Sequence, residues 1–354
     1  MHIASRPIDR SHPPYVIAEL GVNHDGSVHR ALELVDAAHY AKADAVKLQF
    51  FKTDLLMSSA AKLASYQAAA GESDPISMLR RLEFSTQNMA PVVNRAHELG
   101  MHAIVTVFSD SLVREAMTLP WDAFKTASPD ITHKPLLDAL VASGLPLIIS
   151  TGAANLDEVA RAMGWLAPAR DRTAVLQCVS SYPTGVQHAA LAGIADIAKL
   201  APGPVGYSDH TSLLETGAMA VAAGACVLEK HLTYDNHAKG PDHAASLTGV
   251  NLAIYIRLVR QAHAMMGEGK VVQSIEHDVR KVSRQSITTT RPLPVGHVLS
   301  AADLTIKRPG TGLEPSRLES TIGRRLARHH AQAAARRAGR VGAAVDHEHR
   351  GREP

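Results

Sequence analysis

The sequence predicts an α/β protein in which a closed (β/α)8 TIM barrel is followed by a small β-rich module. Eight short apolar runs alternate with stretches that carry apolar residues at helical spacing, all before residue 267. Hydrophobic residues make up 45% of the chain but aromatic residues only 4%, which is typical of α/β cores built from Ala, Val, Leu and Ile. This repetition favours the barrel over its alternative, an open doubly wound sheet.

Each apolar run is short enough for a single buried strand. Apolar periodicity and glycines at expected C-terminal caps (Gly100, Gly144 and Gly224) predict helices between the runs. Ser212 and Asn155 each stand three residues before a glutamate, which predicts capping boxes. The predicted strands are residues 15–19, 45–50, 102–106, 123–126, 146–150, 174–178, 205–208 and 226–231, and the clearest helices are 28–41, 89–99, 135–143, 156–166, 215–223 and 250–266.

The rest of the chain is less regular. Residues 51–78 are too long for an ordinary connection, and such segments usually act as lids or contact partners. After the barrel domain (1–266) we expect a polar linker (267–285) and a small domain (286–330) with strands at 286–291 and 303–307. The Ala/Arg-rich tail (331–354) has almost no large apolar side chain, so we expect a frayed helix or disorder there.

Composition also bears on partners and location. The chain has no apolar run of membrane-spanning length and no apolar signal-peptide core, so we expect a cytoplasmic protein without membrane contact. Cys178 and Cys226 are far apart and are expected to be reduced thiols. Of the net charge of +3, residues 324–354 contribute +5. A basic tail without interleaved aromatic residues gives no reason to expect a nucleic-acid partner.

Two histidines mark the ends of the last two predicted strands. If these strands are parallel neighbours, His210 and His231 leave the same edge of the sheet about 4.8 Å apart. Each alone could be a packed core histidine, but the pair, within a polar set that includes Ser208, Asp209, Glu229 and Lys230, favours a shared divalent cation.

The other strand ends are polar as well. Lys47 and Lys125 would be costly to bury without anions, which indicates a substrate that carries phosphate or carboxylate groups. An ion pair between Glu19 and Lys47 is the structural alternative for Glu19. Hydrolytic metal chemistry is disfavoured, because no HExxH motif, P-loop or Gly-x-Ser-x-Gly elbow is present. The remaining polar side chains at these ends include Gln49, Thr106, Ser128, Asp130, Ser150, Ser180 and Tyr182.

At these positions the chain resembles the sialic acid synthases, the phosphoenolpyruvate-dependent N-acetylneuraminate synthase family with a C-terminal antifreeze-like (SAF) domain. The resemblance extends from about residue 15 to residue 328. The motifs that carry it are IAELGVNHDG (17–26), DAVKLQ (44–49), ISTG (149–152), GYSDHT (206–211), LEKH (228–231), GPDH (240–243), IKRPGTG (306–312) and IGR (322–324).

The resemblance implies a domain-swapped homodimer that condenses phosphoenolpyruvate with an open-chain N-acylmannosamine-type aldose. It implies that His210 and His231 hold Mn²⁺ or Mg²⁺, which acts as a Lewis acid on the aldehyde. Arg308 would reach across from the partner subunit, and Gln49, Tyr182 and Asp242 would meet the sugar. Phosphoenolpyruvate would be surrounded by Lys47, Thr106, Lys125, Ser128, Ser150, Ser180 and Ser208.

The expected catalytic set is Glu19, Asp130, Lys125 and His231. Carbon 3 of phosphoenolpyruvate would attack the aldehyde, water would add at carbon 2, and phosphate would leave. Glu19 and Asp130 are both candidates for handling the proton of the water and the aldehyde, and the sequence does not assign one role to each.

Three departures from the family pattern leave the acceptor open. Ser-Pro-Asp at 128–130 replaces Ser-Gly-Glu, Thr-Val-Phe-Ser at 106–109 replaces Thr-Pro-Phe-Ser, and Ser180 stands where some members have Asn. N-acetylmannosamine or a related aminosugar is expected, with a di-N-acetylated 6-deoxy hexose, as in legionaminic or pseudaminic acid formation, as the alternative. A third hypothesis is a barrel that binds a phosphorylated metabolite without turnover. After Arg328 the expected last strand is missing, which leaves the completeness of the small domain open.

Overall fold

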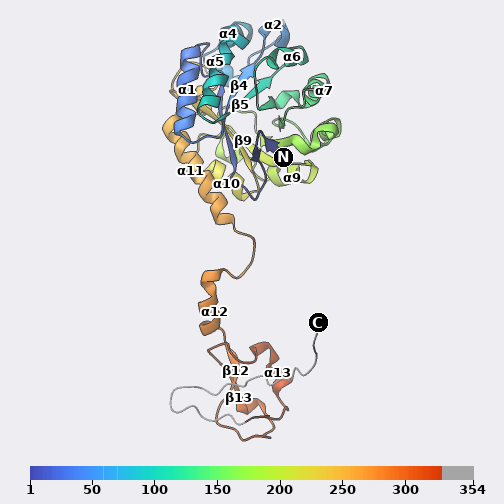
Figure 1. Ribbon diagram of the computed structural model, residues 1–354, viewed down its shortest axis with the longest axis vertical. Coiled ribbons are helices and arrows are strands. Elements are labelled where there is room, and N and C mark those ends of the chain that lie inside the picture. The colour runs from blue at the N-terminus through green and yellow to red at the C-terminus, as the bar shows by residue number, and fades with distance from the viewer. Residues whose placement is uncertain (59, 70, 329–354) are drawn as a thin grey trace, which may run out of the picture. The chain divides into compact units, whose positions relative to one another are not determined.

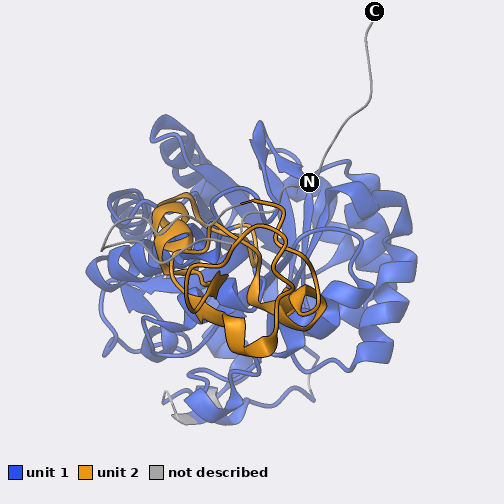
Figure 2. Ribbon diagram, turned by 90° about the horizontal axis from the view of Figure 1, so that it is seen from below, with its two compact units in different colours: residues 1–267 blue, residues 268–354 orange. Residues whose placement is uncertain are grey.

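The chain divides into two compact units, Met1–Gly267 and Glu268–Pro354, which Figure 2 shows in different colours. The computed structural model describes residues 1–58, 60–69 and 71–328. The predicted tail, residues 331–354, lies outside the described residues.

Eight parallel strands close into a barrel in the first unit, which confirms the predicted fold class (Figure 1). Each strand pairs with the next along the chain, and the last strand pairs with both its predecessor and the first, so the sheet has no free edge. The strands are β3 (Tyr15–Gly21), β4 (Ala45–Phe50), β5 (His102–Val107), β6 (Ala123–Thr126), β7 (Leu147–Ser150), β8 (Thr173–Cys178), β9 (Val205–Asp209) and β10 (Val227–Thr233).

A ring of helices covers the outside of the barrel, and α1, α5 and α11 lie side by side on one flank (Figure 1). No helix among the described residues is both long enough and apolar enough to cross a bilayer. The ring consists of α1 (Val28–Tyr40), α5 (Thr86–Glu98), α6 (Val113–Ala116), α7 (Lys134–Ala142), α8 (Leu156–Trp165), α9 (Gly193–Leu200), α10 (Thr216–Ala222) and α11 (Gly249–Met266), and β11 (Leu247–Thr248) precedes the last of them.

The predicted helix ends are largely confirmed. Gly100, Gly144 and Gly224 have φ values of 73°, 80° and 110°, the left-handed conformation of C-terminal caps. Asn155 forms the predicted capping box with Glu158. The box predicted at Ser212 is wrong, since α10 starts only at Thr216; Thr211 hydrogen-bonds Asp209 and Thr216 and keeps the intervening residues in a turn.

The barrel interior changes in character along the strands. At the N-terminal ends the inward side chains are apolar and form one cluster, which includes Ile17, Ile104 and Ile148. The hairpin β1 (His2–Ile3) and β2 (Arg6–Pro7) closes this end, and Ile3 joins the cluster. Side chains alternate between the two faces of a strand, so every second residue points into the barrel. The inward residues nearer the carboxyl ends of the strands are polar. This change places a polar chamber at the carboxyl ends of the strands.

The segment after β4 is folded rather than an open loop. It holds α2 (Thr53–Leu56), α3 (Ser65–Ala69) and α4 (Pro75–Leu82), the last with an Asp74 N-cap and Pro at its first position. Met78 and Leu82 of α4 pack against Val22 and Phe51 in a separate apolar cluster. The long connection therefore builds a wall near the carboxyl ends of the barrel strands.

The second unit has its own small core. β12 (Ser286–Thr289) and β13 (Leu304–Lys307) pair antiparallel, which confirms the two predicted strands. Their apolar side chains pack with three other leucines in a cluster of Ile287, Leu293, Leu299, Leu304 and Leu326. The short helices α12 (His277–Ser283) and α13 (Leu318–Thr321) flank the pair in sequence, and α12 falls in the segment predicted as a polar linker.

Candidate active site

A cavity of about 470 Å³ opens at the carboxyl ends of the barrel strands. It brings together nearly all the site residues that the sequence predicted. Arg308 is the exception, because it belongs to the second unit and is exposed there. The predicted residues that line the cavity are Glu19, Lys47, Gln49, Thr106, Lys125, Ser128, Asp130, Ser150, Ser180, Tyr182, Ser208, His210, His231 and Asp242.

Lys47 and Lys125 form the cationic floor of the cavity. Lys47 Nζ donates to Thr106 Oγ1 at 2.8 Å, and Lys125 Nζ donates to Ser150 Oγ at 2.5 Å. Burial opposes the charge on Lys47, but Glu19 and Glu229 outweigh it and raise the Lys47 pKa. Burial lowers the Lys125 pKa, and Glu229 offsets only part of that effect. Two ammonium groups thus face a space that an anion can fill.

Glu229 is the counter-ion between these lysines. Its Oε1 lies 3.6 Å from Lys125 Nζ, its Oε2 lies 3.9 Å from Lys47 Nζ, and Ser208 Oγ donates to Oε1 at 2.9 Å. Burial raises the Glu229 pKa, yet the two lysines outweigh burial and leave the pKa lowered. The sequence reasoning gave this residue no role, although its position two residues before His231 places both on the same face of the strand.

Glu19 is held by two neighbours at the top of β3. It contacts Lys47 Nζ, and Gln49 Nε2 donates to its Oε1 at 3.0 Å. The ion pair considered as a structural alternative is therefore present, and it lies inside the cavity. The strand has an irregular register between Glu19 and Gly21, where Gly21 has a φ of 52° and a Cβ would lie 3.1 Å from Glu19 Oε1. Glycine at this position leaves room for the carboxylate.

Asp130 is a carboxyl group of a different kind. It lies in the 3-10 helix η2 (Ser128–Thr132) after β6, and its Oδ2 is buried without a hydrogen-bond partner among the described residues. Burial raises the Asp130 pKa to about 7, against a hydrogen bond from the Ala127 backbone and the charge of Lys125. A carboxyl group that titrates near neutral pH can both give and take a proton.

The hydroxyl groups of Ser128 and Ser180 both lie close to Gly152. The backbone N–H of Gly152 donates to Ser128 Oγ at 3.1 Å. A Cβ at Gly152 would lie 2.3 Å from Ser180 Oγ and 2.7 Å from Ser128 Oγ, so any other residue would push these hydroxyls apart. Gly152, two residues after the end of β7, thereby leaves room for two hydroxyl groups on the same side of the cavity.

His210 and His231 stand side by side, with ring centroids 5.4 Å apart. His210 Nδ1–H donates to Val179 O at 2.8 Å, which leaves Nε2 as a lone-pair donor. His231 Nδ1 is buried with no hydrogen-bond partner among the described residues. Two free imidazole nitrogens fit a divalent cation whose other positions are taken by water or substrate. The part of the chain that the structure describes contains no metal-binding set of three or more His, Cys, Asp or Glu side chains.

The two imidazoles differ in their electrostatic surroundings. Burial lowers the His231 pKa well below its usual range, and the nearby cationic groups add to this effect. Burial also opposes the charge on His210, but Cys178 and the Val179 carbonyl outweigh it and raise its pKa.

Tyr182 and Asp242 border the histidines. The Tyr182 ring lies 4.0 Å from the His210 ring and meets His231 edge-on at 5.7 Å. Asp242 Oδ2 lies 3.6 Å from His231 Nδ1. Burial raises the Asp242 pKa, although His210, His243 and Lys47 oppose the rise. Both side chains belong to loops that follow barrel strands, β8 for Tyr182 and β10 for Asp242.

The outer wall of the cavity is apolar. It is contributed mainly by the segment after β4, and sequence reasoning did not assign any of its side chains. No lysine or arginine joins this wall among the described lining residues, so the two lysines of the floor are the cavity's strongly basic groups. The wall consists of Val22, Leu56, Met57, Met78, Leu79, Leu82 and Phe108.

Two predicted members of the polar set lie elsewhere. Lys230 Nζ is 3.4 Å from Asp209 Oδ2, and both side chains are 0% exposed. Neither lines the cavity. They project from the outer face of the barrel, where Lys230 also lies 5.8 Å from the Tyr255 ring. The pair is a structural ion pair between sheet and helices. By contrast Cys178, expected only as a buried thiol, does line the cavity, with Sγ 3.8 Å from His210 Nδ1.

Known proteins resemble this chain along most of its length. A model of the NeuB family matches residues 34–271, and a model of the SAF domain matches residues 284–330. The chain is 37% identical over 329 residues to N,N'-diacetyllegionaminic acid synthase of Legionella pneumophila, which covers 91% of this chain and 92% of that protein. It is 30% identical over 305 residues to N-acetylneuraminate-9-phosphate synthase of Mus musculus, with 85% of each chain covered.

A solved structure has the same architecture. The crystal structure of N-acetylneuraminic acid (sialic acid) synthetase from Leptospira borgpetersenii in complex with citrate superposes with a TM-score of 0.72. The sequence identity is 28%, and the match covers 79% of this chain and 94% of that one.

Proposed function

The chain belongs to the NeuB family, and from this premise we propose that it condenses phosphoenolpyruvate with an N-acyl aminosugar aldose to give a nonulosonic acid and phosphate. The membership confirms the resemblance to the sialic acid synthases and the barrel-plus-SAF fold. One observation carries the proposal: two buried lysines and a pair of available imidazoles face the same cavity. The lysines suit an anionic donor, and the imidazoles suit a cation beside the aldehyde.

Phosphoenolpyruvate binds over the floor in this proposal. Its phosphate and carboxylate groups accept charge-assisted hydrogen bonds from Lys47 and Lys125, which are already oriented by Thr106 and Ser150. The hydroxyls of Ser128, Ser180 and Ser208 complete the set from the neighbouring strand ends. Lysines held in place before the donor arrives lose little side-chain entropy when it binds.

The reaction forms one carbon–carbon bond and exchanges the carbon–oxygen bond to phosphate for a carbon–oxygen bond to the oxygen of water. Carbon 3 of phosphoenolpyruvate attacks the aldehyde carbon, and the aldehyde oxygen takes a proton to become a hydroxyl. Water adds to carbon 2 and loses one proton, and the bond between carbon 2 and the bridging oxygen then breaks. The new hydroxyl passes its proton to the departing phosphate and becomes the keto oxygen of the product. When bound by His210 and His231, Mn²⁺ or Mg²⁺ would supply Lewis-acid polarisation of the aldehyde oxygen.

Asp130 suits the proton transfers better than Glu19 does. Its pKa is raised to about 7, and its Oδ2 has no partner among the described residues. Glu19 is already engaged by Lys47 and Gln49, so its proposed role is to orient those two side chains. Asp130 is the proposed acid–base group.

The acceptor is proposed to be an unphosphorylated aminosugar. Tyr182, Gln49 and Asp242 would hold its hydroxyl and amide groups, and its far end would lie against the apolar outer wall. A phosphate there would have no lysine or arginine to pair with among the described lining residues of unit 1. The mouse relative, N-acetylneuraminate-9-phosphate synthase, is less similar to this chain (30% identity) than the Legionella synthase is (37% identity).

A di-N-acetylated 6-deoxy hexose is the second candidate acceptor. The outer wall favours it, because Leu56, Met57 and Leu79 can bury a methyl group where N-acetylmannosamine has a hydroxyl. The similarity to N,N'-diacetyllegionaminic acid synthase supports the same choice.

A domain-swapped homodimer, in which Arg308 of one subunit completes the site of the other, is part of the proposal.

A phosphate-release assay with three acceptors tests the proposal. N-acetylmannosamine, its 6-phosphate and a di-N-acetylated 6-deoxy hexose are each incubated with phosphoenolpyruvate, with and without Mn²⁺. We expect release only when an unphosphorylated aldose is present, and a product mass equal to that of the aldose plus pyruvate. Release without aldose, or none with any of the three, would contradict the synthase. Preference for the 6-phosphate would contradict the acceptor class alone.

A further inference from the structure

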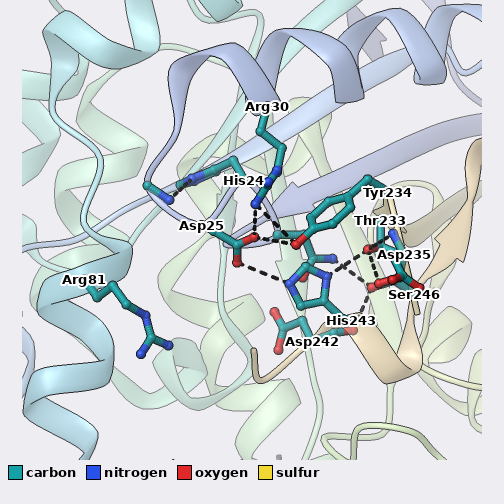
Figure 3. Close-up of polar contacts among 12 residues, drawn as sticks. His24, Asp25, Arg30, Arg81, Thr233, Tyr234, Asp235, Asp242, His243 and Ser246 are labelled. Atoms are coloured by element: carbon teal, nitrogen blue, oxygen red, sulfur yellow. Dashed lines mark hydrogen bonds and ion pairs between the residues drawn. The ribbon is translucent and has the colours of Figure 1, made fainter. Parts of the chain in front are cut away.

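A second polar cluster joins two loops at the carboxyl ends of the barrel strands (Figure 3). Asp25 belongs to the turn between β3 and α1, and His243 belongs to the 3-10 helix η5 (His243–Ala245) in the loop after β10. Asp25 Oδ1 lies 3.2 Å from His243 Nε2. On the other carboxylate oxygen, Arg30 donates at 2.6 Å and the Tyr234 hydroxyl donates at 2.9 Å.

Both ring nitrogens of His243 lie within hydrogen-bond distance of an oxygen atom. Its Nδ1 lies 2.8 Å from Thr233 Oγ1. That hydroxyl donates its own hydrogen to Asp235 O at 2.9 Å, so it accepts from the imidazole. Nε2 faces the Asp25 carboxylate, which has only acceptors when ionised. Burial raises the Asp25 pKa, but hydrogen bonds from His243, Tyr234 and Arg30 outweigh burial and lower it. The imidazole side chain is only 1% exposed, and it links Thr233 of β10 to Asp25 of the β3–α1 turn.

The loop that carries His243 also carries Asp242, which lines the cavity. His243 points toward Asp25 (Figure 3), whereas the neighbouring Asp242 lines the cavity. Gly240 lies against the imidazole, since a Cβ there would be 2.8 Å from its Cδ2. Ser246 Oγ donates to Asp242 O at 2.7 Å and accepts from Asn23 Nδ2 at 2.8 Å. The loop is therefore tied to the β3–α1 turn at both His243 and Ser246.

We propose that the Asp25–His243 pair positions the Asp242 carboxylate for the acceptor sugar. The inference rests on the proposed function, in which Asp242 holds the sugar. Residues 234–246 form a long connection between β10 and β11, and a connection of this length samples many conformations unless it is anchored. His243 and Asp25 are positioning residues, because neither lines the cavity in the structure. A shift of about 1 Å in a substrate contact can cost roughly 100-fold in rate.

The kinetic test uses the full-length protein with H243Q and D25N. Asn tolerates the left-handed conformation of Asp25, whose φ is 50°, so D25N retains the backbone while it removes the charge. Each variant should lower kcat/KM for the aldose roughly 10- to 100-fold. The KM for phosphoenolpyruvate should stay within about twofold of the wild type, because the lysines of the floor are untouched. An equal loss for both substrates would overturn the positioning role.

A double-mutant cycle separates positioning from general damage. If His243 acts through Asp242, H243Q should lower kcat/KM by less than about twofold in the D242A background. Additive losses would contradict the inference. H97Q is the matched control, since His97 Nε2 pairs with Asp122 Oδ2 at 2.9 Å and neither residue lines the cavity. Its kinetics should match those of the wild type.

Hydrogen exchange tests the inference even if no aldose is turned over. The amides of Ala245 and Ser246 donate to Asp242 O at 3.2 Å and His243 O at 3.1 Å. In H243Q and D25N the peptide that contains residues 240–246 should exchange at least about tenfold faster, while peptides from β4 and β6 stay protected. Unchanged exchange at 240–246 would refute the anchoring, whereas an inactive wild type with faster exchange in the variants would contradict only the proposed function.

Discussion

Glu229 Oε1 lies 3.6 Å from Lys125 Nζ on the inner face of the barrel, and both side chains are at most 5% exposed. The second carboxylate oxygen faces Lys47, so a single buried carboxylate serves two ammonium groups. Glu19 also contacts Lys47, and both ammonium groups still line the cavity, where an anionic ligand can pair with them. In the proposed reaction that ligand is phosphoenolpyruvate.

Replacing Glu229 by Gln should weaken the fold and strengthen donor binding. The amide can still accept from Ser208, but the lysines lose their shared counter-ion, which costs roughly 3 to 5 kcal/mol of unfolding free energy when a buried pair is broken. Phosphoenolpyruvate then meets less repulsion, so its Kd should fall. Denaturant unfolding and titration calorimetry measure the two effects. The control is E115Q in the exposed pair with Lys52, which should change stability by less than about 1 kcal/mol.

Asp130 should make the stability depend on pH. Its folded-state pKa of about 7 lies above its ordinary value of 3.8, so the folded protein keeps a proton that the unfolded chain loses. The resulting stabilisation is complete below pH 3.8 and is lost as the pH rises through about 7. D130N removes this loss, so relative to the wild type it should gain stability between pH 5 and pH 8, while kcat falls roughly 100-fold or more.

Thermal unfolding at several pH values provides the measurement for Asp130. D138N, which changes an exposed carboxylate paired with Lys134, serves as the control and should follow the wild type across the series. If the Tm difference between D130N and the wild type were the same at pH 5 and pH 8, the raised pKa would be wrong.

The two histidines should be needed for metal-dependent turnover. Protein treated with a chelator should lose activity and recover it with Mn²⁺ or Mg²⁺, whereas H210A and H231A should stay folded and fail to recover. Titration calorimetry with Mn²⁺ should show binding in the wild type and in H12A, which removes an exposed histidine, but not in the two site variants. Full activity in either site variant would exclude these residues as ligands.

Arg308 should act across subunits. R308A and K125M are each expected to be inactive, but a mixed dimer has one intact barrel served by the intact Arg308 of its partner. Co-expression of the two variants should therefore restore part of the activity, and co-expression of R308A with K47M should do the same. No recovery in either mixture, with mixed dimers present by mass spectrometry, would contradict the cross-subunit role.

Much of the fold follows from local patterns. Alternating apolar runs and helical stretches predict the barrel because each strand and its helix must bury one another. The end of β3 could not be predicted in this way. It runs two residues beyond Glu19 through an irregular register with β4, and register depends on pairing between distant segments.

The sequence predicted the site residues that follow the ends of strands. It did not predict which of two adjacent strand residues points into the barrel. Glu229 and Lys230 are adjacent on a strand that is buried on both faces, so hydrophobic alternation does not reveal which of them points inward. The structure turns Glu229 into the cavity and Lys230 toward Tyr255. The apolar wall was also out of reach, since α4 meets Val22 and Phe108 only through contacts between segments far apart in the sequence.

The most direct test of the proposed condensation follows the bridging oxygen of phosphoenolpyruvate. With ¹⁸O between carbon 2 and phosphorus, the wild type and an unphosphorylated N-acyl aminosugar aldose should release phosphate that carries the label, in amounts equal to the nonulosonic acid formed. Unlabelled phosphate, or labelled phosphate formed at the same rate without aldose, would contradict the account.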